Sequence, residues 1–215
     1  MAKNLKWQDD YWLLLMQIFL QKPVGMKPTY CREMVSLALE LHIPPQVLKD
    51  KMKELARLDT PRIERIWETY NNKPQKLARA VRLLREMKGF GQASLFYEGV
   101  ETNETWEKDW QPVAGSQRLT PVMLILVLDL YFRLTPATMV TETPEVKELS
   151  IMLKISTEDI VEVMDIYLHC DPYLNRRDVI MNPLLQPCLT IWQRYGNGDT
   201  EELAKLAEDL KAYYL

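Results

Sequence analysis

The chain has 215 residues, of which 47% are hydrophobic and 27% are charged, so it is long enough to bury a core as one domain or as two small ones. This composition argues against intrinsic disorder. Seven glycines are few for an all-β chain, whereas Leu, Met, Glu, Lys and Ala, which favour helices, are abundant. We therefore predict an all-α fold.

The net charge of −3 conceals an uneven distribution along the chain. Residues 1–90 hold 17 Lys and Arg against 10 Asp and Glu, a net +7, whereas residues 91–215 hold 10 against 20, a net −10. Such a split can mark a nucleic-acid-binding half beside an acidic half. The simpler interpretation is that oppositely charged halves attract each other or a second copy of the chain.

The predicted cellular compartment rests on the cysteines and the apolar segments. Cys31, Cys170 and Cys188 are odd in number and form no CxxC pair, so a disulfide framework is not expected. The most apolar runs, Trp12–Leu20 and Pro121–Phe132, are shorter than the roughly 20 residues that span a bilayer. The first residues lack the apolar core and cleavage site of a secretory signal. We predict a cytoplasmic protein without a membrane partner.

The first half contains five segments with helical spacing of apolar residues. Prolines mark the start of the third and fifth segments, and Gly89 follows the last one. The predicted helices are Gln8–Leu20, Tyr30–Leu41, Pro45–Leu58, a helix around Ile66–Tyr70, and Pro74–Lys88.

Residues 89–118 separate this half from the next. The segment carries too many large apolar groups for a loose tether, namely Phe90, Phe96, Tyr97, Trp106 and Trp110. We predict a linker that packs across both halves and joins them.

The second half again contains five helical segments. Thr143 is a plausible N-cap, and Ser156 with Asp159 and Asp199 with Glu202 have the spacing of capping boxes. The predicted helices are Pro121–Leu134, Pro144–Leu153, Thr157–His169, a helix around Ile191–Tyr195, and Thr200–Tyr214.

The two halves share an internal similarity. The pentapeptide IWETY at Ile66–Tyr70 returns as IWQRY at Ile191–Tyr195. A shift of 112 positions places residues 7–60 on 119–172 without a gap, and after about 13 additional residues the pentapeptides align at a shift of 125. Apolar positions coincide almost throughout, which chance would not produce over so long a span. The sequence therefore predicts two tandem repeats, residues 1–88 and 119–215, joined by the 89–118 linker.

The second repeat resembles a known family. It runs LILVLDLYF, TPEVKELSIML, IVEVMDIYLHCDP and IWQRY, a pattern similar to the small helical domain before the HNH nuclease core of McrA-type restriction endonucleases. The family's Gly-Arg-Ser turn and its nuclease core have no counterpart here. The resemblance implies a helix-turn-helix-like module for target recognition, without catalysis. Its matching residues are Trp7 in the first repeat and Tyr131, Pro144, Glu145, Asp171, Pro172, Ile191 and Trp192 in the second.

No constellation in the sequence predicts an enzyme, a metal site or a cofactor. The only histidines, His42 and His169, lie at the edges of apolar helices without ligands at metal-binding spacing. Phosphate-binding loops and nucleophile motifs are missing. The candidate functional residues are therefore sought on the exposed faces of the predicted helices.

The strongest surface candidate lies on the predicted helix Pro45–Leu58. In a helix-turn-helix the second helix enters the major groove. Lys49, Lys53 and Arg57 recur every four residues opposite the apolar face, and such a stripe could neutralise phosphates. The alternative is a solvated face in which Asp50 pairs with Lys53 and Glu54 with Arg57. The last helix of the first repeat adds Lys76, Arg79, Arg82, Arg85 and Lys88, for which we predict a solubilising role.

The matching helix of the second repeat differs in polarity. Its apolar residues cover most of the circumference, and the remaining stripe is Glu158, Glu162 and Asp165. Carboxylates would repel a phosphate backbone, so we expect this helix to be buried against the linker or the other repeat. The chain is thus predicted to be a non-enzymatic binding module that binds DNA through its first repeat. The alternative is a protein-interaction or self-associating protein with no nucleic-acid role.

Overall fold

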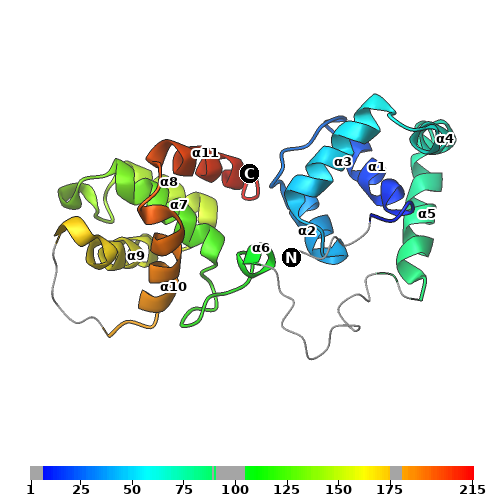
Figure 1. Cartoon of the computed structure of the whole chain (residues 1–215). Helices are drawn as coiled ribbons and strands as arrows, with labels where there is room; N and C mark the ends of the chain where they lie inside the picture. The colour runs from blue at the N-terminus through cyan, green and yellow to red at the C-terminus, as the bar shows by residue number, and fades with distance from the viewer. Residues whose placement is uncertain (1–6, 89, 91–104, 175–180) are drawn as a thin grey trace. The chain divides into compact units, whose positions relative to one another are not determined.

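The computed structural model describes residues 7–88, 90, 105–174 and 181–215. All regular elements within these residues are helices, so the predicted all-α class is confirmed (Figure 1). The chain forms two compact units, Met1–Asn103 and Glu104–Leu215. None of the described helices has the length and the apolar content that a bilayer crossing requires.

The first unit is built around its first helix. The helix α1 packs against each of the other four, and Leu14, Leu15 and Met16 are fully buried in these contacts. Prolines begin three of the helices, where the missing N–H costs no hydrogen bond. The helices are α1 Tyr11–Leu20, α2 Arg32–Leu41, α3 Pro45–Arg57, α4 Pro61–Tyr70 and α5 Pro74–Glu86.

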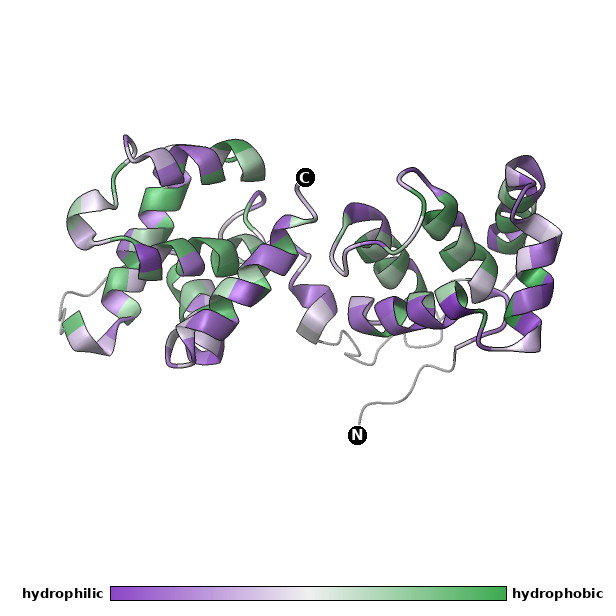
Figure 2. Ribbon diagram, turned by 90° about the horizontal axis from the view of Figure 1, so that it is seen from above, coloured by the Kyte–Doolittle hydropathy of each residue, from purple (hydrophilic) through white to green (hydrophobic). Residues whose placement is uncertain are grey.

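The second unit is built around α7. Residues 122 and 124–131 of this helix are buried because α8, α9, α10 and α11 pack around it. Figure 2 shows hydrophobic residues on helix faces turned toward the other helices of the same unit. The elements are α6 Thr105–Lys108, α7 Pro121–Arg133, the 3-10 turn η2 Pro136–Thr138, α8 Pro144–Leu153, α9 Thr157–Cys170, the 3-10 turn η3 Pro172–Leu174, α10 Leu185–Ile191, the π-helix η4 Trp192–Gly196 and α11 Thr200–Lys211.

The structure confirms some of the predicted helix caps and corrects others. The Ser156 hydroxyl accepts from the Asp159 N–H at 3.1 Å and the Asp159 carboxylate accepts from the Ser156 N–H at 3.2 Å, so this capping box is confirmed. The predicted capping box of Asp199 with Glu202 is wrong. The Asp199 carboxylate caps α11 by accepting from the Glu201 N–H at 2.8 Å. Thr143 is the N-cap residue of α8 as predicted, but its hydroxyl donates to the Thr138 carbonyl and makes no capping hydrogen bond to the helix.

The two pentapeptides take different backbone forms. Ile66–Tyr70 ends the regular helix α4, whereas Ile191 ends α10 and the next five residues form the π-helix η4. Gly196 lies against the indole of Trp192, so closely that an added Cβ would come within 2.5 Å of the ring. A side chain at this position would therefore displace the indole from the core.

The described parts of the predicted linker pack within their own units. The ring of Phe90 contacts Tyr11 of α1 at 6.2 Å between centroids. In the second unit, Trp110 contacts Tyr213 at 4.7 Å, and the Val113 N–H donates to the Leu119 carbonyl. The predicted linker residues Phe96 and Tyr97 lie outside the described residues.

Candidate nucleic-acid interface

The candidate interface starts with the turn between α2 and α3. Three residues, 42–44, join the helices, and His42 adopts the left-handed conformation with φ of 55°. Its neighbour Ile43 is buried and donates its N–H to the Ala38 carbonyl at 3.0 Å, which closes the end of α2. The turn therefore fixes the angle at which α3 leaves α2.

The inner face of α3 is as the sequence predicts. Leu48, Met52 and Leu55 are fully buried, and α3 packs against both α1 and α2. This anchoring leaves the opposite side of the helix to solvent.

Lys49 differs from the predicted solvent-facing stripe. Its side chain is half-buried, and Nζ donates to the backbone carbonyl of Lys27. The buried Lys27 amine in turn donates to the carbonyl of Gln21 at 2.7 Å and to that of Pro23. Lys49 therefore holds the segment between α1 and α2 against α3.

Lys53 and Arg57 lie on the exposed side of α3 as predicted. The Lys53 amine pairs with the Asp50 carboxylate at 2.7 Å, whereas Arg57 forms no ion pair with any described residue. The predicted pair of Glu54 with Arg57 is wrong. Glu54 binds Lys51 at 2.8 Å, because the Lys51 amine is directed to that side by the rings of Trp7 and Trp12, whose centroids are 5.7 and 5.6 Å away.

The cations of α5 are divided between intramolecular pairs and solvent. Arg85 forms two hydrogen bonds with Glu40 of α2, at 2.6 and 2.7 Å, which raise the pKa of its guanidinium. Arg82 is 3.6 Å from Glu86, a long and exposed contact. In the part of the chain that the structure describes, Arg79 and Lys88 have no ionic partner and are exposed.

The corresponding helix of the second unit, α9, is covered by its own unit. It packs against α7, α8 and α10, which corrects the expectation that the linker or the other repeat buries it. Leu184, the N-cap residue of α10, and Cys188 within α10 are buried, and Asn182 donates to Glu162 of α9 at 2.7 Å. The carboxylates of Glu158, Glu162 and Asp165 remain exposed.

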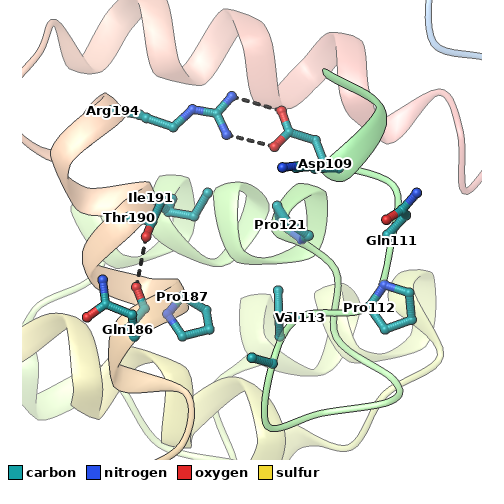
Figure 3. Close-up of a pocket in the computed structure, with 12 residues that line it drawn as sticks. Asp109, Gln111, Pro112, Val113, Pro121, Gln186, Pro187, Thr190, Ile191 and Arg194 are labelled. Carbon is teal, nitrogen blue, oxygen red and sulfur yellow. Dashed lines mark hydrogen bonds and ion pairs between the residues drawn. The ribbon is translucent and has the colours of Figure 1, made fainter. Parts of the chain in front are cut away.

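The second unit also has a groove that no sequence motif indicates (Figure 3). Its volume is about 430 Å³, and it lies between the 108–121 loop and α10. One end is closed by Arg194, whose guanidinium binds both carboxylate oxygens of Asp109 at 2.7 and 2.8 Å; this pair raises the Arg194 pKa. The walls are largely apolar, formed by Pro112, Val113, Pro121, Pro187 and Ile191. They belong to segments far apart in the chain, so no single sequence window predicts the groove.

The described cysteines and His169 lie in structural surroundings. No group of three or more His, Cys, Asp or Glu within the described ranges could hold a metal ion. His169 Nδ1 donates to the Asp165 carbonyl at 2.8 Å within its own helix, a structural role. Burial raises the pKa of Cys188 to about 12 and that of Cys170 to about 11, the opposite of an activated nucleophile.

Thiol labelling checks this conclusion. At pH 8 a thiol with a pKa of about 11 is only about one part in a thousand thiolate, so we expect native Cys170 and Cys188 to react with 5,5′-dithiobis(2-nitrobenzoate) about 100-fold more slowly than after unfolding in urea. Burial also raises the pKa of Cys31, so its thiol is expected to react more slowly in the native protein than after unfolding. A native thiol that reacts as fast as free cysteine would contradict the burial of that side chain.

Comparison of the chain with protein-family models, curated proteins and solved structures found no match.

Proposed function

We propose that the chain is a non-enzymatic binding protein made of two diverged copies of one helical unit, and that the first copy binds DNA through the outer face of α3. The unit Met1–Asn103 carries 17 basic and 12 acidic residues, a net +5, whereas Glu104–Leu215 carries 10 and 18, a net −8. The copies would therefore have different partners.

Equivalent ring contacts support the duplication. In the alignment, Phe19 corresponds to Tyr131 and Trp67 to Trp192. Each unit pairs its two rings edge to face at 5.8 Å, with interplanar angles of 75° and 76°. Two sequences that had converged on helices alone would have no reason to share this pair.

Backbone geometry supports the duplication independently. His42 and Lys154 are 112 positions apart, and both end a helix in the left-handed region, with φ of 55° and 58°. Non-glycine residues rarely adopt this conformation, so its recurrence at aligned positions favours common descent.

DNA binding by the first unit is supported above all by the exposure of Lys53 and Arg57 on the outer face of α3. The helix is held by α1 and α2, and a three-residue turn precedes it, as in helix-turn-helix proteins. A solvent-exposed ion pair such as Asp50–Lys53 contributes little stability, so Lys53 can exchange its carboxylate for a phosphate. In the second unit the corresponding positions of Arg57 and Lys53 are His169 and Asp165, which disfavours binding there.

Charge reversal tests the proposal. We expect Lys53→Glu combined with Arg57→Glu to weaken binding of a fluorescent DNA duplex about 10-fold or more at low salt, because two phosphate contacts become repulsive. The slope of log K against log salt should fall by about 2, as measured by fluorescence anisotropy between about 50 and 200 mM salt.

The control is Lys205→Glu in the second unit, an exposed lysine on α11 that changes the net charge without touching α3. Lys53→Glu and Arg57→Glu, each made alone, change the net charge by the same amount as this control. If Lys205→Glu weakens binding as much as either of these single variants does, the effect belongs to total charge. Undiminished binding by the α3 double variant would remove α3 from the interface.

A further inference from the structure

A second surface of the first unit lies on α5. Its inner face buries Leu77, Val81 and Leu84, and the helix packs against α1. On the outside, Leu83 is 50% exposed and Met87 is 61% exposed. Met87 is the C-cap residue directly after α5 and lies four positions from Leu83, so the two form one apolar strip at the C-terminal end of the helix.

Cations continue this strip toward the start of the helix. Arg79 precedes Leu83 by four positions, and Lys76 lies one further turn away, with its amine 5.2 Å from the Tyr70 ring centroid. The guanidinium of Arg79 has no carboxylate among its described neighbours. A face that combines exposed apolar groups with uncompensated positive charge fits an acidic partner surface.

The second unit carries such a surface on α9. Glu158, Glu162 and Asp165 follow one another at spacings of four and three, so they line one side of the helix. Their described contacts are to neutral groups: Glu158 accepts from the Thr157 hydroxyl and Glu162 from Asn182. The half-buried Val161 borders this stripe and offers an apolar contact.

We propose that the α5 face of one chain docks on the α9 carboxylates of a second copy of the chain. Lys76 and Arg79 meet Glu158, Glu162 and Asp165, and Leu83 and Met87 lose their exposure to water. The opposite net charges of the two units, +5 and −8, bring the copies together in this orientation. The inference does not depend on DNA binding, because α3 contributes nothing to it.

The two surfaces are different, so the contact is head-to-tail. After one such contact the first chain still has a free α9 face and the second a free α5 face, so assembly can continue beyond a dimer. A contact of one helix face is small, which places it among weak interfaces that form at high protein concentration.

Charge-swapped full-length variants test the proposal. At low salt and rising concentration, the weight-average mass of the natural chain in sedimentation equilibrium is expected to rise above that of the monomer, and about 0.5 M salt should reverse the rise because it screens exposed charges. Lys76→Glu with Arg79→Glu, or Glu158→Lys with Asp165→Lys, should each keep the chain monomeric. The chain that carries all four substitutions should associate again.

Restored association by the fourfold variant separates a specific contact from a folding defect, and circular dichroism verifies that each variant remains helical. A natural chain that stays monomeric at low salt and high concentration would overturn the proposal. So would association that survives both reversals, or a fourfold variant that stays monomeric. If the α5 reversal instead abolishes binding to anionic phospholipid vesicles or DNA while leaving the mass unchanged, the α5 face serves that ligand and the proposal is wrong.

Discussion

Replacement of Trp192 by alanine is expected to lower the free energy of unfolding of the second unit by about 3–5 kcal/mol. The indole is 5% exposed, and its ring lies 5.8, 5.7 and 6.1 Å from those of Tyr131, Phe132 and Tyr167. Truncation leaves a cavity among three aromatic rings that are fixed on α7 and α9, so the surroundings cannot close it. Urea denaturation of the full-length protein, followed by far-ultraviolet circular dichroism, measures the loss.

Trp67→Ala is the matched control in the first unit. That indole is half-buried and contacts one described ring, Phe19, so we expect a smaller loss, of about 1–3 kcal/mol. An equal or larger loss at Trp67 would contradict the burial that distinguishes the two sites.

Gly115→Ala is expected to destabilise the second unit by about 2–4 kcal/mol. Gly115 has φ of +90°, a conformation that costs alanine about 1 kcal/mol, and an added Cβ would come within 2.6 Å of the Pro183 Cβ and 3.1 Å of the Pro183 backbone. Backbone cannot move aside as a flexible side chain can, so overpacking adds about 1–3 kcal/mol. The same denaturation experiment measures the effect.

Gly25→Ala separates the cost of the positive φ from the cost of overpacking. Gly25 also has a positive φ, +126°, but nothing lies within 4 Å of its added Cβ, so only the backbone cost of about 1 kcal/mol is expected. If the two alanine variants lose the same stability, the close approach of Gly115 to Pro183 adds no cost, and the packing of the 108–121 loop against Pro183 is contradicted.

The helices could be predicted from the sequence because their signals are local. Apolar spacing predicts the long helices of the described residues, and start signals place Pro45 and Pro144 at the first positions of α3 and α8. Several ends were less accurate: α1 starts at Tyr11 and not at Gln8, and α5 stops at Glu86 and not at Lys88. Terminal turns depend on few hydrogen bonds, so a pattern of apolar residues does not define them.

The candidate site could be predicted only in part. Spacing correctly placed Lys53 and Arg57 on the exposed side of α3, but it placed Lys49 there as well. The Lys27 carbonyl that binds Lys49 is 22 residues away, so helical periodicity contains no information about it. The π-helix at Trp192 was also missed, because the similar pentapeptides IWETY and IWQRY predict the same conformation, whereas the first is regular helix in α4 and the second mostly forms the wider turn of η4.

The sequence by itself determined that the chain is helical, which faces of the helices are buried, and that its two halves carry opposite charge. These properties follow from residue type and from the 3.6-residue period of the helix. Only the tertiary structure decided which charged side chains remain available. Lys49, Lys51 and Arg85 are bound to groups of their own unit, whereas Arg57 and Arg79 face solvent without a described ionic partner. A long charged side chain pairs with a carboxylate or carbonyl that lies within its reach, and the tertiary fold determines which of these groups are near.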